Sequence, residues 1–187
     1  LSELAIIRNR VLMVGHLINY HNAFIKMKQL IKNGKIGIPQ NIRANRLALG
    51  SIRSEESVIY DLSAHDISMI LSITEELPID VNVQSIHHHN NIGPDAVCVK
   101  LLFSKGLTAL INSDWMCPYK EHKFSAIGTK GSLIFDDTKT WSEKLLYNPS
   151  FVTSNNEIVS SPIEKIKIQE NEPLKSELKE FINCLHS

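Results

Sequence analysis

The sequence predicts an α+β protein in which one open, mostly antiparallel sheet carries its helices on one face. Two observations support this fold class. Apolar residues spaced three and four apart occur near the start and the end of the chain, whereas the residues after Pro78 form short runs rich in β-branched and apolar side chains. The turn signals "SKG" and "GTKG" separate these runs at hairpin spacing, and strands joined by short turns pair antiparallel.

The N-terminal part predicts a helix, a strand and a second helix. Residues 2–9, "SELAIIRN", have the composition of the last two turns of a helix. Residues 10–16, "RVLMVGH", predict a short buried strand because four consecutive apolar residues end at a glycine. From Asn22 an amphipathic helix is expected to run to Gly34, with an apolar stripe made of Phe24, Met27, Leu30 and Ile31.

The middle of the chain predicts one strand and one helix. Residues 39–49, "PQNIRANRLAL", alternate, with Ile42, Ala44 and, as a third candidate, Arg46 facing one way. A helix is expected at about residues 63–73, with Ser63 as its N-cap. Its buried side is predicted to consist of Ile67, Ile70, Leu71 and Thr74.

Five further strands are expected after Pro78, followed by an irregular region and a final helix. The strand segments are "DVNVQSI", "AVCVKLLF", "LTALINSDW", "HKFSAIG" and "GSLIFDD". Residues 148–171 are polar and irregular, with "TSNNE" as a loop tip. The segment "EPLKSELKEFINCL" predicts an amphipathic helix whose apolar face is formed by Leu174, Leu178, Phe181, Ile182 and Leu185.

Composition indicates a soluble cytoplasmic protein. The 187 residues are 43% hydrophobic and 21% charged, and 20 basic side chains balance 20 acidic ones. Neither half of the chain forms a basic patch, which argues against nucleic acid or an anionic membrane as a partner. Three widely spaced cysteines without a CxxC motif are typical of reduced thiols. No apolar run is long enough for a membrane helix, and the first residues lack a signal-peptide pattern.

The segment "VIYDLSAHDISMIL", residues 58–71, contains the strongest candidate for chemistry. Asp61 and His65 are four residues apart, so in a helix the carboxylate can hydrogen-bond one ring nitrogen and leave the other to exchange a proton with a substrate hydroxyl. Asp66 is less suitable because it points about 100° around the helix from His65. The alternative is an acidic helix start followed by a surface histidine.

Three other groups of residues are weaker candidates. The run "HHHN" at residues 87–90 suggests a metal site, but it lacks accompanying ligand motifs, and we expect histidines at a loop end. His16, Tyr20 and His21 follow the expected strand 10–16, where polar residues can line a pocket. Trp115 is a possible pocket aromatic, although a tryptophan at a sheet edge more often serves packing.

These segments together resemble one family. "RVLMVGHLINYHNAFIKMKQLIKNGKIGIPQNIRANRL", "VIYDLSAHDISMIL", "LINSDW", "AIGTKGSLIFDD" and "EPLKSELKEFINCL" are similar in order and spacing to the C-terminal part of the glucose–fructose oxidoreductase/inositol dehydrogenase/MocA family. The resemblance implies an NAD(P)-dependent sugar or cyclitol dehydrogenase in which Asp61 and His65 are the catalytic pair. It also suggests a substrate pocket near His16, Tyr20, His21, Arg46 and Trp115.

The resemblance also implies a division of the chain and an assembly. Residues 1–16 correspond to a remnant of the Rossmann domain, namely a helix and its last strand, and residues 17–187 to the C-terminal substrate domain. The family's glycine-rich loop and Glu-Lys-Pro motif have no counterpart, so NAD or NADP is expected only in a full-length parent and no cofactor on this chain alone. The open sheet face is expected to form a homo-oligomer through Val81, Val83, Val97, Val99, Leu101, Leu107 and Leu110.

The expected substrate is a sugar or nucleotide sugar, and the segment "NRLALGSIRSEESVIYDLSAHDIS", residues 45–68, most resembles enzymes that oxidise UDP-amino sugars. One alternative is a catalytically silent dimerisation or binding module without the cofactor domain. Another, with less support, is a metal-dependent isomerase or hydrolase that uses the histidine run.

Overall fold

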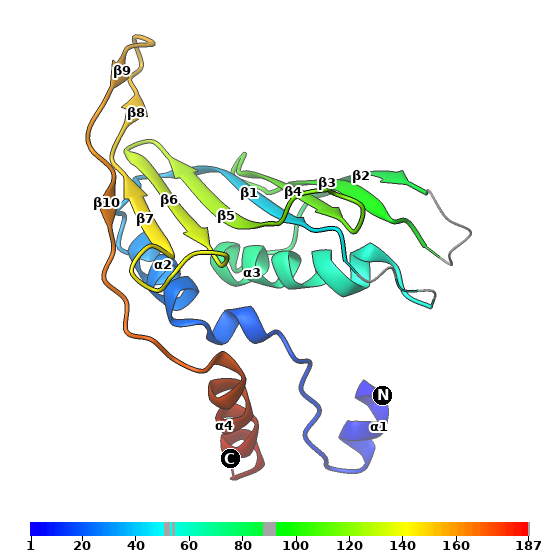
Figure 1. The fold of residues 1–187 in the computed structure, drawn as a ribbon. Coiled ribbons are helices and arrows are strands. Elements are labelled where there is room, and N and C mark those ends of the chain that lie inside the picture. The colour runs from blue at the N-terminus through cyan, green and yellow to red at the C-terminus, as the bar shows by residue number, and fades with distance from the viewer. Residues whose placement is uncertain (51–52, 54, 88–92, 187) are drawn as a thin grey trace.

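An open eight-stranded sheet forms the body of the computed structural model, which describes residues 1–50, 53, 55–87 and 93–186 (Figure 1). The α+β class predicted from the sequence is confirmed. The strands are β1 (Pro39–Leu47), β2 (Asp80–Ile86), β3 (Ala96–Leu102), β4 (Thr108–Asp114), β5 (Glu121–Gly128), β6 (Gly131–Asp136), β7 (Leu145–Asn148) and β10 (Glu164–Lys165).

The strand order is β10-β7-β6-β5-β1-β4-β3-β2. Most neighbours are antiparallel, and β1 and β4 are the parallel pair. As a result, β1, the first strand in the sequence, lies in the middle of the sheet. Its C-terminal residues therefore lie between β4 and β5, where Arg46 pairs with Ser113 on one side and His122 on the other.

Two helices, α2 (Asn22–Lys32) and α3 (Ala64–Thr74), cover one face of the sheet (Figure 1). Side chains that alternate along the strands point toward these helices and form the core, for example Ile42 and Ala44 of β1 and Ala109 and Ile111 of β4. The ring of Phe24 on α2 meets that of Phe124 on β5 edge to face, with centroids 5.8 Å apart. Burial of this apolar layer is the main contribution that holds the helices on the sheet.

The remaining elements lie away from the sheet. They are α1 (Ser2–Ile7), the 3₁₀ turn η1 (Leu17–Tyr20), α4 (Pro173–His186) and the hairpin of β8 (Phe151–Val152) and β9 (Ile158–Val159). In Figure 1, α4 lies beyond η1 and the hairpin projects past the end of the sheet. The Asn171 side chain anchors the segment before α4, since it accepts a hydrogen bond from the Asn22 N–H (3.0 Å) and donates one to the Tyr20 carbonyl (2.8 Å).

The structure corrects several predicted elements. Residues 10–16 are not a buried strand: they form no strand, and Val11, Leu12 and Val14 are exposed. The region 148–171 is less irregular than expected, because it contains β8, β9 and β10.

The start of α3 also differs from the expectation. Ser63 precedes α3 as predicted, but its hydroxyl donates to Ser113 Oγ (2.9 Å) and makes no capping hydrogen bond. A π-helical turn, η2 (Ile59–Ser63), leads into the helix. The buried side of α3 includes Asp66, Met69 and Ile70, whereas the predicted Ile67, Leu71 and Thr74 are only partly buried.

The residues expected to cover the open sheet face are largely elsewhere. Val97, Val99 and Leu101 are buried in the core on the helix side. By register Val81 and Val83 face that same side, where they remain exposed at the edge strand. Leu107 is partly buried against the core. Of the expected set, Leu110 does lie on the open face, where the alternation adds the partly buried Ile127, Ile134 and Leu146.

Among the described residues, no helix combines the length and the apolar character needed to cross a bilayer.

Candidate active site

The candidate site lies where η2 and the first turn of α3 meet the middle strands of the sheet. A π-helical turn widens the helix by one residue per turn, and such turns often occur at functional sites. Here the turn contains Asp61 and ends just before α3, which carries His65 and Asp66. The Asp61 carboxylate is close enough to His65 for its charge to raise the pKa of the ring.

Asp61 is bound by two other side chains. Its Oδ1 accepts a hydrogen bond from Arg53 Nε at 3.0 Å, and its Oδ2 accepts one from Trp115 Nε1 at 2.9 Å. No hydrogen bond joins Asp61 to His65 within the described part of the chain. The structure thus directs the Asp61 oxygens to Arg53 and Trp115, and Asp61 and Trp115 lie together at the end of β4. The catalytic pairing of Asp61 with His65 stays a prediction.

Asp66, which the sequence argument set aside, is the carboxylate buried at the centre of the site. Arg46 on β1 holds it with two hydrogen bonds, from Nε at 3.2 Å and from Nη2 at 2.9 Å. The two side chains are 12% and 4% exposed. Both oxygens of the Asp66 carboxylate are thereby hydrogen-bonded. Arg46 therefore points toward α3, on the strand face predicted for it.

His65 is half-buried beside this ion pair. Burial and the neighbouring Arg46 charge lower the pKa of His65, with a smaller lowering from His16, and the carboxylates of Asp66 and Asp61 oppose them. The ring is therefore neutral at neutral pH and able to accept a proton. The His16 ring lies edge to face with it, with centroids 6.3 Å apart and planes at 85°.

His122 is a further histidine at this site that the sequence argument missed. It lies opposite Arg46 in the β1–β5 register, on the strand face that carries the buried Phe124. Burial, followed by the charges of Arg46 and Lys120, lowers the pKa of His122. Only the register of two strands about 75 residues apart brings it to Arg46, and no local sequence pattern signals that pairing.

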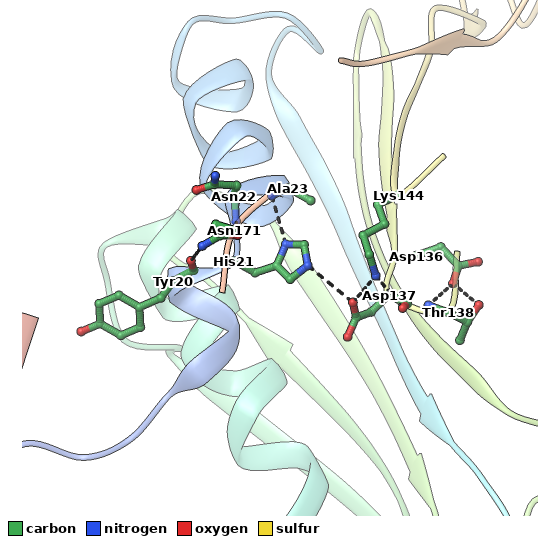
Figure 2. A network of polar contacts seen from close by, with 9 residues as sticks. All are labelled: Tyr20, His21, Asn22, Ala23, Asp136, Asp137, Thr138, Lys144 and Asn171. Carbon is green, nitrogen blue, oxygen red and sulfur yellow. Dashed lines mark hydrogen bonds and ion pairs between the residues drawn. The ribbon is translucent and has the colours of Figure 1, made fainter. Parts of the chain in front are cut away.

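His21 has a separate, structural environment (Figure 2). It is 4% exposed, its Nδ1 accepts the Ala23 N–H at 3.0 Å to cap α2, and its ring stacks on Trp141 with centroids 4.6 Å apart. Its Nε2 is 3.6 Å from Asp137 Oδ1, a carboxylate that also binds Lys144. Burial is the main reason that the pKa of His21 is lowered.

Tyr20 points away from His21 in Figure 2. Burial and the charges of Glu177 and Glu180 raise its pKa. The structure thus brings His16, Arg46, Asp61, His65 and Trp115 to one region, and it places Tyr20 and His21 outside that cluster. Residues 88–90 of the histidine run lie outside the described residues, and the described residues contain no group of three potential metal ligands.

A comparison with protein families identifies the domain. The model of the GFO/IDH/MocA C-terminal domain matches residues 24–134. The chain belongs to this family. The GFO/IDH/MocA domain matched here includes Arg46, Asp61, His65, Asp66, Trp115 and His122.

Individual proteins are similar to parts of the chain. UDP-N-acetylglucosamine 3-dehydrogenase of Acidithiobacillus ferrooxidans is 34% identical over 80 residues, which is 42% of this chain and 24% of that protein. A solved structure of UDP-N-acetylglucosamine 3-dehydrogenase GnnA from Acidithiobacillus ferrooxidans matches this chain with a TM-score of 0.79 at 21% identity, over 99% of this chain and 57% of that one.

Two further solved structures have the same fold. One is from Magnetospirillum magnetotacticum MS-1, with a TM-score of 0.81 at 22% identity over 100% of this chain and 59% of that one. The other is an inositol dehydrogenase homolog of Azotobacter vinelandii in complex with NADH and myo-inositol, with a TM-score of 0.71 at 17% identity, over 90% of this chain and 45% of that one. The chain spans less than two thirds of the length of each of these proteins.

Proposed function

We propose that this chain is the substrate-binding and catalytic domain of an NAD(P)-dependent dehydrogenase that oxidises a ring hydroxyl of a sugar or nucleotide sugar. The observation that carries the proposal is His65: a half-buried, neutral imidazole beside a buried Arg46–Asp66 pair, in a domain of the GFO/IDH/MocA family. Oxidation of an alcohol releases the hydroxyl proton, and a neutral histidine within reach of the hydroxyl is suited to take it.

The charges around His65 fit that role. Before the reaction, burial and Arg46 favour the neutral ring, which is the form that can act as a base. After the ring takes up the proton, Asp66 and Asp61 stabilise the imidazolium. Asp61 thus has a catalytic role through its charge, and its hydrogen bond with Trp115 keeps that charge at the site.

Two relatives support the substrate class. UDP-N-acetylglucosamine 3-dehydrogenase, by its name, acts on a nucleotide sugar, and the inositol dehydrogenase homolog was crystallised with a cyclitol. Both substrates carry ring CH–OH groups. A UDP-linked amino sugar is the substrate we favour, since that relative shares the higher sequence identity.

The described residues do not themselves fit a dinucleotide. The pyrophosphate of such a cofactor is held by a glycine-rich turn that leads from a strand into a helix N-terminus. Within the described ranges, α2 follows the 3₁₀ turn η1 and α3 follows the π turn η2, and neither entry is glycine-rich. We therefore propose that the cofactor is bound by a part of a longer protein that contains this chain.

The test is an activity screen on that longer protein. Purified protein is incubated with NAD⁺ or NADP⁺ and a panel of UDP-N-acetylglucosamine, UDP-glucose, free aldoses and myo-inositol, and reduced cofactor is followed by absorbance. We expect turnover with a nucleotide sugar. If the protein binds the nucleotide sugar tightly but turns over no member of the panel, the proposed dehydrogenase activity is contradicted and a silent binding module is favoured.

A further inference from the structure

Around the turn η1 lie four buried polar atoms that have no hydrogen-bond partner among the residues that the structure describes. They are His16 Nδ1, Asn19 Oδ1, His65 Nδ1 and Glu177 Oε1. Buried polar side-chain atoms are nearly always satisfied, so four such atoms around one turn mark a place built to hold a polar group. The turn η1 contacts both α3, which carries His65, and α4, which carries Glu177.

Three of these atoms belong to the junction between η1 and the first turn of α3. The rings of His16 and His65 meet edge to face, with centroids 6.3 Å apart. Asn19 Nδ2 donates to Ser68 Oγ at 3.1 Å, and Ser68 Oγ in turn donates to the His65 carbonyl at 2.7 Å. The Asn19 side chain is thereby held beside the backbone of His65, with its Oδ1 still without a partner.

A histidine that acts as a base through one ring nitrogen must carry its proton on the other, and that N–H needs an acceptor. Asp61 is the acceptor that the sequence suggested, but its oxygens are directed to Arg53 and Trp115. By contrast, the buried Nδ1 of His65 lies in the same junction as two potential acceptors, His16 Nδ1 and Asn19 Oδ1.

We propose that His16 and Asn19 are the positioning residues of His65, and that they accept the proton on its Nδ1 through one buried water molecule. A buried water commonly bridges two to four polar groups, and these three atoms supply that number of partners. The arrangement fixes the Nδ1–H tautomer and leaves Nε2 as the base. The catalytic meaning of this assignment rests on the proposed function, whereas the tautomer itself is a property of the chain alone.

The tautomer can be measured on the 187-residue chain without substrate or cofactor. Long-range ¹H–¹⁵N correlation spectra of ¹⁵N-labelled protein at about pH 8, where histidines are neutral, report which ring nitrogen carries the proton. We expect Nδ1–H for His65 in the wild type and in Asp61→Asn. The double variant His16→Phe/Asn19→Ala removes both acceptors and is expected to convert His65 mainly to Nε2–H.

His16→Asn is the matched control, because its amide oxygen replaces the acceptor at nearly the same distance from the backbone, and it should retain Nδ1–H. The spectra of His21 and His122 verify that each variant is folded. If the double variant does not fold, His16→Phe and Asn19→Ala alone should each lower the Nδ1–H fraction. The assignment is overturned if His65 carries its proton on Nε2 in the wild type. It is also overturned if Asp61→Asn converts His65 to the Nε2–H form and the acceptor variants do not. Both outcomes are independent of the activity screen.

Discussion

Removal of the Arg46 charge by Arg46→Met should strongly destabilise the domain. Methionine keeps most of the apolar stem, but it leaves Asp66, whose side chain is 4% exposed, without its cation. Two hydrogen bonds of 3.2 and 2.9 Å are lost. Bonds to charged groups contribute about 1.5–3 kcal/mol each, and breaking a buried ion pair from one side typically costs about 3–5 kcal/mol.

We therefore expect the free energy of unfolding, measured by urea titration with circular dichroism, to fall by about 3–5 kcal/mol in Arg46→Met. For a chain of this size that corresponds to a drop in Tm of about 6–20 °C. The pKa of His65 should rise in the same variant, because Arg46 no longer lowers it while Asp66 still raises it.

The double variant Arg46→Met/Asp66→Leu is the matched control. It removes both charges and leaves an apolar contact between β1 and α3, so most of the lost stability should return. A loss below about 1 kcal/mol in the single variant would refute the reasoning, since that is the size of an exposed ion pair. A double variant as unstable as Arg46→Met would show that the uncompensated Asp66 charge is not the cause.

Three further results are expected. In Gly128→Ala, the added Cβ would lie 2.3 Å from the Ile36 carbonyl oxygen, so the backbone must shift. The free energy of unfolding, measured by urea titration, should fall by about 1–3 kcal/mol. An unchanged unfolding midpoint would contradict the close approach. Burial lowers the pKa of His21, His65 and His122 in the folded state, so the unfolded state binds more protons below about pH 6.5. The free energy of unfolding should therefore decline as the pH falls from about 7.5 to 5.5. A constant free energy of unfolding over that range would contradict these shifts. Apolar side chains on the open sheet face should support a homo-oligomer, seen by light scattering at high micromolar concentration, and a monomer there would count against it.

Local patterns in the sequence were sufficient to predict the main elements. The alternation in residues 39–49 and the apolar runs after Pro78 correspond to β1 to β6, and the stripe from Phe24 to Ile31 corresponds to α2. Each of these elements buries one face in the core, so its apolar residues recur with the period of a strand or a helix. The sequence pattern alone is therefore enough to predict it. The strands β7 and β10, of four and two residues, are too short to show any period.

Non-local pairing explains most of what the sequence did not reveal. The apolar run "VLMV" reads as a strand, yet no strand of the described sheet pairs with residues 10–16. The carboxylate of Asp61 accepts a hydrogen bond from Trp115, which is 54 residues away, and not from His65, which is four residues away. Asp66 can be buried at the centre of the site because Arg46, on a strand 20 residues earlier in the sequence, lies opposite α3 and neutralises its charge. The sequence around Asp66 does not show this partner.

The central claim is that His65 takes the proton of a substrate hydroxyl, and the most direct measurement is the turnover of His65→Ala in the longer protein that contains this chain. General acid–base catalysis contributes about 10²–10⁴-fold, so kcat should fall by that factor, with little change in KM if the ring acts mainly in the transition state. Circular dichroism should confirm that the variant is folded. Wild-type kcat in a folded His65→Ala protein would contradict the claim.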